Sequence, residues 1–277
     1  MSTIKMIALD LDGTTMRSDG TLSPGNRAAI EAARDAGVNV VICTGRVESA
    51  LPDEVKNLDG IKYAITSNGS RITDLHTKEC IYGDFLSKKA LRKSIEVASE
   101  NHITIEAFYD GLAYIDRELY DDIEANGCDY RNREYVLKTR IPVDDIYDRM
   151  REHEDCIENI NFFFPSPEIL ETYRSKIESI PDAMITMSFP VNLEVGGPET
   201  SKRKALEALM KILDVKQDEL MCIGDAPNDI EMIKFAGTGV AMGNAWGGTK
   251  DYADFVTKTN DEDGVAYAIE KFVFGRE

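Results

Sequence analysis

Three apolar segments constrain the fold more than any other feature of this sequence: KMIALDL, VNVVIC and ELMCIGD. Each is almost continuously apolar instead of alternating, which is typical of strands buried on both faces of a parallel sheet. Between the first two lies SPGNRAAIEAARDAG, for which Ser23 predicts the N-cap, Pro24 the first turn and Gly37 the stop of a helix. This strand–helix–strand order predicts an α/β fold with a doubly wound, Rossmann-like parallel sheet as its core.

The pattern changes near Asp84. A helix is expected in SKKALRKSIEVASEN and a hairpin through Asp110 and Gly111, whereas residues 117–138 show no clear periodicity. Strands and helices mixed in this way indicate an α+β unit of about 100 residues, an ordinary domain size. The segment VNLEV, which begins at Val191, is expected to resume the parallel sheet. The sequence therefore predicts a core made of residues 1–84 and 189–277, interrupted by an inserted domain at 85–188.

Charge and composition exclude several classes of partner. The chain has 277 residues, 32 Lys and Arg against 50 Asp and Glu, and a formal net charge of −18. Such a chain repels nucleic acid and anionic membranes unless it carries a local basic patch, and the sequence shows none. It contains no apolar run of membrane-spanning length, and MSTIKMIALD lacks the features of a signal peptide, so we expect a cytoplasmic protein. The five cysteines form no CxxC pair, which predicts neither a zinc site nor a disulfide framework.

The first strand ends in two carboxylates. Residues two apart on an extended strand point to the same side, so Asp10 and Asp12 are expected to address one site while Gly13 turns the chain away. Two close carboxylates repel each other, and a hard cation such as Mg²⁺, which prefers oxygen ligands, relieves that repulsion. A carboxylate can also attack phosphorus and form an aspartyl phosphate. The alternative is an aspartate-rich turn without a function.

Two further segments carry groups that suit a phosphate. Thr44 and Gly45 follow a buried strand, and a helix expected to begin at Arg46 would offer backbone N–H groups to an anion. A plain N-cap explains this pattern equally well. Lys202 lies in the first turn of a predicted helix, where the helix dipole disfavours a cation. An anionic partner would account for that position, and so would a solvated basic turn.

A third strand end is also acidic. Asp225 ends the apolar segment ELMCIGD, and Asn228 and Asp229 open the next predicted helix. Because ligands of open α/β sheets bind at the carboxyl ends of the strands, these side chains are expected near Asp10. Asp225 would add an oxygen ligand for the same cation. Acidic residues that cap a helix are the alternative.

Taken together, DLDGTT, TGR, the SK before a helix, and GDAPNDIEM followed by GVAMGNA resemble the four motifs of the haloacid dehalogenase superfamily. SNG, ADFVT and DEDGVA are similar to its Cof-type phosphatases, subclass IIB. The resemblance implies that Asp10 is the nucleophile and Asp12 the general acid and base. It implies Mg²⁺ ligation by Asp10, Asp12 (through its carbonyl), Asp225 and Asp229, and phosphate binding by Leu11 (through its N–H), Thr44, Gly45, Lys202 and Asn228. Arg203 departs from the family pattern, which tends to have glycine there.

The resemblance implies a Mg²⁺-dependent phosphatase, with the inserted domain as a cap that reads the leaving group. The expected substrate is a small phosphorylated metabolite, such as a sugar phosphate. Two alternatives stay open: a phosphosugar mutase of the same superfamily, and an inactive phosphate-binding or regulatory module. The sequence leaves the particular substrate and the oligomeric state undetermined.

Overall fold

The computed structural model describes residues 3–59, 61–128 and 131–276. The chain divides into two compact units. The first unit comprises Met1–Gly45, Leu51–Tyr82 and Ser201–Glu277, and the second comprises Arg46–Ala50 and Gly83–Thr200. Among the described residues, no helix is both long enough and apolar enough to cross a membrane.

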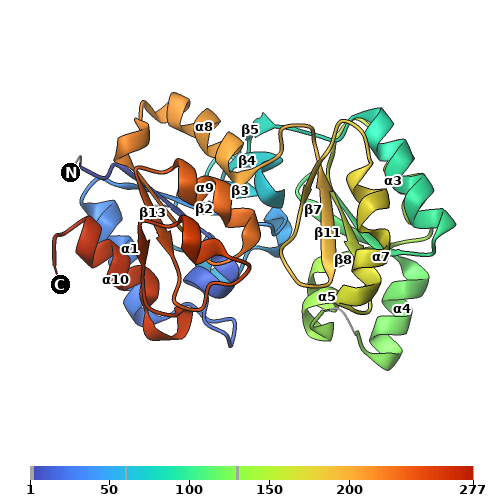
Figure 1. The fold of residues 1–277 in the computed structure, drawn as a ribbon, viewed down its shortest axis with the longest axis horizontal. Coiled ribbons are helices and arrows are strands. Elements are labelled where there is room, and N and C mark those ends of the chain that lie inside the picture. Colours follow the sequence, from blue (N-terminus) through green and yellow to red (C-terminus); the bar gives the residue numbers. More distant parts are fainter. Residues whose placement is uncertain (1–2, 60, 129–130, 277) are drawn as a thin grey trace. The chain divides into compact units, whose positions relative to one another are not determined.

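The first unit (Figure 1) is built on a sheet that has eight strands in the described residues. Their order is β14-β13-β12-β1-β2-β3-β4-β5. The pairs from β14 to β3 are parallel and β4 runs antiparallel to β3, as expected from the apolar segments. The strands are β1 (Met6–Leu9), β2 (Asn39–Cys43), β3 (Tyr63–Thr66), β4 (Arg71–Asp74), β5 (Cys80–Gly83), β12 (Leu220–Gly224), β13 (Thr238–Ala241) and β14 (Phe255–Val256).

Helices cover both faces of this sheet, which explains why its central strands are apolar throughout. The helices α1 (Pro24–Asp35) and α10 (Gly264–Phe272) pack in one core with alternate residues of β1, β2 and β12. The helices α8 (Lys202–Leu213) and α9 (Ile230–Phe235) pack in a second core with the other residues of these strands. The predicted cap of α1 is confirmed, since the Ser23 hydroxyl accepts a hydrogen bond from the Asn26 N–H at 3.0 Å. The short helix α2 (Asp53–Lys56) lies between β2 and β3 in the chain.

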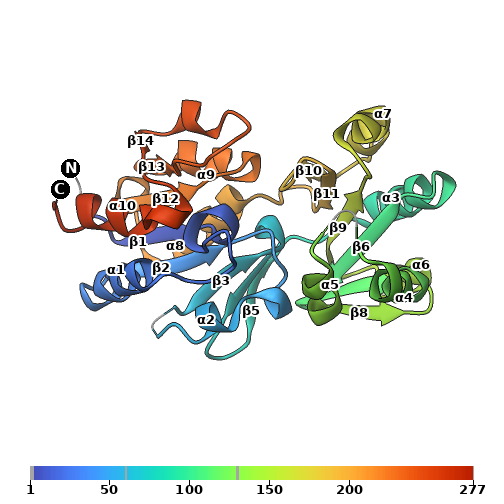
Figure 2. The ribbon, with the colours of Figure 1, turned by 90° about the horizontal axis from the view of Figure 1, so that it is seen from below.

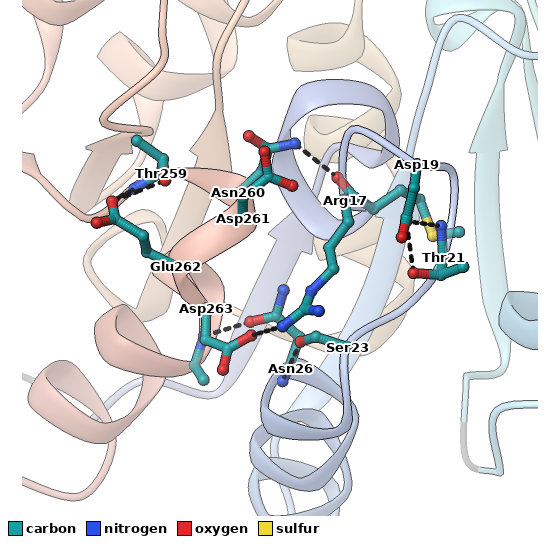
Figure 3. A network of polar contacts seen from close by, with 12 residues as sticks. Arg17, Asp19, Thr21, Ser23, Asn26, Thr259, Asn260, Asp261, Glu262 and Asp263 are labelled. Atoms are coloured by element: carbon teal, nitrogen blue, oxygen red, sulfur yellow. Dashed lines mark hydrogen bonds and ion pairs between the residues drawn. The ribbon is translucent and has the colours of Figure 1, made fainter.

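Polar contacts join the N-terminal and C-terminal pieces of the first unit (Figure 3). The Asn260 amide donates to the Met16 carbonyl at 3.0 Å, and the Arg17 guanidinium lies 3.5 Å from the Asp263 carboxylate. The N–H of Ala266 donates to the side chain of Asn26, also at 3.0 Å. The segment after β1 is therefore fixed by residues that are almost 250 positions away in the chain.

The second unit contains an antiparallel sheet with the order β10-β11-β9-β6-β7-β8, in which β8 is added parallel to β7 (Figure 2). One face carries the apolar core, packed against three helices that supply residues such as Leu91, Met150 and Leu170. The strands are β6 (Thr104–Tyr109), β7 (Leu112–Asp116), β8 (Arg140–Val143), β9 (Ile157–Phe163), β10 (Met184–Thr186) and β11 (Asn192–Gly196), and the helices are α3 (Lys88–Glu100), α6 (Ile146–Glu152) and α7 (Pro167–Glu178).

One expectation for the middle of the chain is wrong. The strand at 192–196 does not resume the parallel sheet: β11 pairs antiparallel with β9 and β10 in the second sheet. The aperiodic stretch contains two helices, α4 (Arg117–Asn126) and α5 (Arg133–Thr139). Each is capped by a side chain, Asp116 and Asn132 respectively, and each buries one apolar residue instead of a full stripe. This explains why neither shows a helical period.

Candidate active site

Asp10 stands at the carboxyl end of the central strand β1. The strand ends at Leu9, and the chain then enters a tight turn, Leu11–Thr15, in which Gly13 has a φ of +77°. Asp10 is buried, with 6% of the residue exposed. The same-side argument for Asp10 and Asp12 fails because the strand is over before Asp12, which is exposed in the turn. The turn itself is what directs the chain around Asp10.

Lys202 connects two of the carboxylates. Its position at the start of α8, with the N-cap Ser201 before it, agrees with the predicted helix. The side chain is 1% exposed, and its Nζ donates to Asp10 Oδ1 and to Asp229 Oδ1, each at 2.7 Å. The alternative of a solvated basic turn is therefore wrong for this lysine. A cation in the first turn of a helix is disfavoured by the helix dipole, and the carboxylates of Asp10 and Asp229 compensate for this.

Asp225 and Asp229 come from the next parallel strand, β12, and from the turn that follows it. Asp225 Oδ1 accepts a 2.8 Å hydrogen bond from the Thr14 hydroxyl. Asp229 is fully buried, and its Oδ2 accepts from the backbone N–H groups of Asp225 and Ala226 at 2.9 and 3.0 Å. Asp229 thus uses both oxygens, one for Lys202 and one for the loop. These hydrogen bonds hold Lys202 and the Asp225 loop in place, and metal ligation by Asp229 stays a prediction.

Burial and mutual repulsion set the electrostatics of these groups. Burial raises the pKa of Asp10 well above its usual value, and the nearby Lys202 opposes that rise. Burial likewise raises the pKa of Asp225 to about 7, with the Asp229 carboxylate adding to the rise and the Thr14 hydrogen bond opposing it. Burial alone would lower the pKa of Lys202, but the Asp10 and Asp229 carboxylates outweigh it and raise that pKa. The ammonium is therefore charged at all physiological pH values.

The donor set fits a hard divalent cation. Carboxylate oxygens of Asp10, Asp225 and Asp229 lie within 4.8 Å of one another, and all three residues are buried. One buried ammonium lies among them, so the negative charge exceeds the positive charge. Burial first, and then repulsion from the neighbouring carboxylates, raises the pKa values of Asp10 and Asp225. Oxygen-only ligands of this kind suit Mg²⁺ better than softer metals. Asp10 and Asp225 are the better ligands, because Asp229 is already engaged.

Glycine at position 13 is required by contact as well as by conformation. A Cβ added there would lie 2.5 Å from Asp225 Oδ2. Gly20 has a similar φ of +80°, but a Cβ there would meet nothing within 4 Å. We expect Gly13→Ala and Gly20→Ala each to lose about 1–2 kcal/mol of unfolding free energy through the left-handed backbone.

The activity of these two variants should then differ, because only a methyl group added at position 13 would displace Asp225. Gly13→Ala is expected to lose at least about tenfold in kcat/KM, and Gly20→Ala to stay within about twofold of wild type. Urea denaturation and steady-state kinetics measure the two effects. Equal kcat/KM values for the two variants would contradict the proposed closeness of the turn to Asp225.

The predicted phosphate groups are only partly placed as expected. Thr44 is buried at the end of β2, but its N–H already donates to the Ile65 carbonyl at 2.9 Å. No α-helix begins at Arg46: a short helical turn at Glu48–Ala50 comes first, and α2 begins at Asp53. The reasoning from a helix N-terminus is therefore wrong here. Gly45 is half-buried directly after Thr44, and phosphate binding by both residues stays a prediction.

Asn228, Leu11 and Asp12 border the acidic group. The Asn228 amide donates to Asn68 Oδ1 at 2.9 Å, which joins the β12 and β3 ends of the sheet. Leu11 is buried at the start of the turn after β1. Burial is the main cause of the raised pKa of Asp225, and the Asp12 carboxylate adds to it. The catalytic and binding roles of these residues stay predictions.

Three contacts of the site were not predicted from the sequence as site residues. Thr14 binds Asp225, Asn68 accepts from Asn228, and the Asn244 amide donates to the Gly13 carbonyl at 2.7 Å. The available signal was their place in the segments DLDGTT, SNG and GVAMGNA. These side chains fix the turns that carry the acidic residues. Because they are uncharged, they do not stand out in the sequence as candidate catalytic or metal-binding residues.

Comparisons with known proteins show the family of this chain. The sequence profile described as haloacid dehalogenase-like hydrolase matches residues 7–269. The chain is 33% identical over 270 residues to the 5-amino-6-(5-phospho-D-ribitylamino)uracil phosphatase YcsE of Bacillus subtilis, covering 98% of this chain and 96% of that protein. The structure of a haloacid dehalogenase-like hydrolase from B. subtilis is similar with a TM-score of 0.83 and 30% identity, covering 96% of this chain and 99% of the other.

A fold similarity extends to subclass IIB. The subclass IIB sugar phosphatase BT4131 has a TM-score of 0.81 with this chain at 24% identity, covering 97% of this chain and 98% of that one. The α/β core with its second unit is thus a fold known from that subclass. The chain belongs to the haloacid dehalogenase-like hydrolases, and the resemblance seen in its motifs is confirmed.

Proposed function

We propose that this haloacid dehalogenase-like phosphatase uses Mg²⁺ to hydrolyse small phosphomonoesters, such as sugar phosphates, through an aspartyl phosphate on Asp10. The observation that carries the proposal is the buried Asp10 carboxylate, held by Lys202 at 2.7 Å beside Asp225 and Asp229. A carboxylate fixed in this way is positioned to attack, and positioning with electrostatics supplies most of the catalysis in phosphoryl transfer.

In the first half-reaction Asp10 attacks phosphorus, and the bond from phosphorus to the leaving oxygen breaks. Asp12, exposed in the turn that follows Asp10, gives its proton to the leaving oxygen, so that an alcohol departs. Lys202 reduces the repulsion between the Asp10 carboxylate and the anionic phosphate, because its ammonium carries a full charge. When bound by Asp10 and Asp225, Mg²⁺ would supply further positive charge to the phosphoryl oxygens.

In the second half-reaction water hydrolyses the aspartyl phosphate. Asp12, now ionised, takes a proton from the attacking water, and the phosphorus–Asp10 bond breaks. Inorganic phosphate leaves, and the Asp10 carboxylate and the protonated Asp12 are restored. Asp229 takes no direct part: it holds Lys202 and the Asp225 loop through its hydrogen bonds.

Removing the proton donor should slow the reaction without removing the nucleophile. Asp12→Asn is expected to lose at least about 100-fold in kcat with an alkyl phosphate, the low end for general acid–base catalysis. With an aryl phosphate the first step needs little protonation, so the phosphoenzyme should accumulate. Single-turnover kinetics with both substrates measure the two steps. Unchanged formation and decay of the phosphoenzyme would remove Asp12 from this role.

The second unit contains a group of buried polar side chains that supports a role in substrate discrimination. Glu106, Asn161 and Glu194 are neighbours across β6, β9 and β11, on the sheet face opposite to the apolar core. The Asn192 amide donates to Asn161 and to Glu194 at 3.0 and 2.8 Å. Groups of this kind bind hydroxyl-rich compounds, so we propose that the second unit is the predicted cap domain and reads the leaving group.

Asn159 offers a way to test this role. Asn159 is 1% exposed, and its Oδ1 has no hydrogen-bond partner among the described residues, so removing that oxygen breaks no hydrogen bond. We expect Asn159→Ala to change the unfolding free energy by less than about 1 kcal/mol. It should also alter kcat/KM for the preferred sugar phosphate by about 10-fold or more while leaving an aryl phosphate within about twofold. Asn126→Ala, on an exposed helix end of the same unit, is the control.

The outcome to compare is the ranking of a panel of sugar, nucleotide and cofactor phosphates. The proposal expects Asn159→Ala to reorder the panel and Asn126→Ala to leave it as in wild type. The same ranking in both variants would show that this face of the sheet does not read the substrate.

Product analysis separates the proposed function from its alternatives. A phosphatase releases inorganic phosphate, whereas a mutase returns an isomeric sugar phosphate. An inactive binding module would bind phosphate without turnover in the presence of Mg²⁺. Inorganic phosphate as the main product from the panel is the expected result. A cytoplasmic location stays a prediction.

A further inference from the structure

A group of potential metal ligands lies in the second unit and shares no residue with the acidic group of the first. The side chains of Asp110, His153 and Cys156 place one ligand atom each within 4.8 Å of one another. Asp110 is exposed, and His153 and Cys156 are half-buried. A carboxylate, an imidazole and a thiol together form a softer donor set than the three aspartates near Lys202. This set suits Zn²⁺ and is poorly suited to Mg²⁺.

Local structure brings these three residues together. His153 ends α6, and Cys156 follows three positions later, just before β9. The Cys156 N–H donates to the His153 carbonyl at 3.0 Å, which closes a turn. This turn brings the Cys156 thiol close to the His153 imidazole. Two ligands separated by two residues are a frequent spacing in zinc sites. Asp110 comes from the β6–β7 hairpin, where its φ is +52°.

Neighbouring residues hold the two ligands of the turn. The imidazole of His153 stacks on the Tyr109 ring with a centroid distance of 4.2 Å and an interplanar angle of 18°. Tyr109 precedes Asp110, so the hairpin orients the histidine as well as supplying the carboxylate. The Lys88 ammonium lies 2.7 and 2.9 Å from Glu154 and Asp155, the two residues between the ligands. The turn is therefore fixed from both sides.

We propose that Asp110, His153 and Cys156 form a zinc site in the second unit, with water completing the coordination. Zn–ligand distances of about 2.0–2.3 Å place tetrahedral ligand atoms about 3.5 Å apart, so the group closes by small side-chain rotations. Zinc takes the thiolate, and the thiol proton passes to solvent. The bound ion links the end of α6 to the β6–β7 hairpin. This inference does not depend on the proposed phosphatase reaction.

Cobalt as a spectroscopic substitute for zinc tests the site in the intact protein. With millimolar Mg²⁺ present to occupy the acidic group, Co²⁺ should produce a near-ultraviolet thiolate-to-metal band, and Zn²⁺ should remove it. Cys156→Ser should abolish the band, and His153→Gln should weaken Co²⁺ binding at least about 100-fold, because loss of groups that merely orient ligands already costs about 10- to 100-fold. Cys128→Ser, a half-buried cysteine of the same unit, is the control and should keep the band.

Thermal unfolding gives a second, independent measure. Zn²⁺ should raise the Tm of the wild type and of Cys128→Ser, but not that of Cys156→Ser or His153→Gln. Two results would overturn the proposal: a wild-type protein without a thiolate band at millimolar Co²⁺, or a band that survives Cys156→Ser. Aryl phosphatase activity in Mg²⁺ should be the same in the wild type and Cys156→Ser, which separates this site from the reaction at Asp10.

Discussion

Asp10→Asn is expected to remove turnover while leaving the fold intact. The asparagine side chain has the same shape, and its amide oxygen can still accept from Lys202, so packing at this buried position is kept. The amide cannot attack phosphorus, and loss of a nucleophile costs several orders of magnitude in kcat, here at least about 10⁴-fold. Steady-state hydrolysis of an aryl phosphate with Mg²⁺ measures the loss.

Asp251→Asn is the matched control for this substitution. Asp251 is an exposed aspartate in the same unit, so it reports the effect of removing one surface carboxylate from a chain with a net charge of −18. It should retain the wild-type rate and stability. A wild-type rate in purified Asp10→Asn would show that another group attacks the phosphate.

Lys202→Met should lower both stability and activity by large amounts. Removing one partner of a buried ion pair leaves an uncompensated charge, and here two buried carboxylates lose the same ammonium. The expected loss is about 3–5 kcal/mol of unfolding free energy. The loss of kcat should be about 10²–10³-fold, the range found when one group that stabilises transition-state charge is removed. Urea denaturation and kinetics measure the two effects.

The loss of stability in Lys202→Met should depend on pH. Burial holds the folded-state pKa of Asp10 above its unfolded value, which is close to about 4, and Lys202 opposes that rise. Without the ammonium the folded pKa of Asp10 rises further. Folding then favours the protonated acid, so the variant loses stability as the pH increases from the unfolded pKa of Asp10 toward its folded pKa. The gap between wild type and variant should be widest at neutral and alkaline pH and should narrow toward about pH 4.

Lys204→Met is the control for the lysine assignment. The Lys204 ammonium lies 3.8 Å from Glu207 on the half-exposed side of α8, and such surface pairs contribute about 0–1 kcal/mol. It should therefore cost little stability and little activity at any pH. Equal effects of Lys202→Met and Lys204→Met would contradict the proposed role of the buried pair.

The core of the fold could be predicted because its signals are local. The apolar segments that became β1, β2 and β12 are buried on both faces, so they lack polar positions almost altogether. Caps such as Ser23 and Ser201 are also local, since each side chain accepts from a backbone N–H three residues later. These features depend on neighbouring residues in the chain, and a single sequence contains them.

The strand β11 could not be assigned to its sheet from the sequence. VNLEV alternates apolar Leu193 and Val195 with polar Asn192 and Glu194, which suits a sheet with one apolar face, but its position beside the core segments favoured the parallel sheet. Its partners in the second sheet, β9 and β10, are fixed by tertiary pairing. The local sequence pattern predicts a strand, but the sheet to which the strand belongs depends on its tertiary pairing.

The candidate site was predictable to the extent that it consists of charged residues at strand ends. Asp10, Asp225 and Asp229 come together because parallel strands present their carboxyl ends at one edge. Lys202 joins them from the start of α8. The supporting contacts of Thr14 and Asn244 could not be read in the same way, since they join turns that are more than 200 residues apart. The proposed zinc site was also not predicted from the sequence, because its histidine and cysteine form no CxxC pair.

The most direct test of the account is to trap the phosphoenzyme. Asp12→Asn with Mg²⁺ and an aryl phosphate labelled in its phosphoryl group would be quenched in acid within the first turnover, and the labelled peptide mapped. The expected result is a phosphoryl label on Asp10 that approaches one per chain and is removed by hydroxylamine, as for any acyl phosphate. A label on any other residue, or turnover without a label on Asp10, would contradict it.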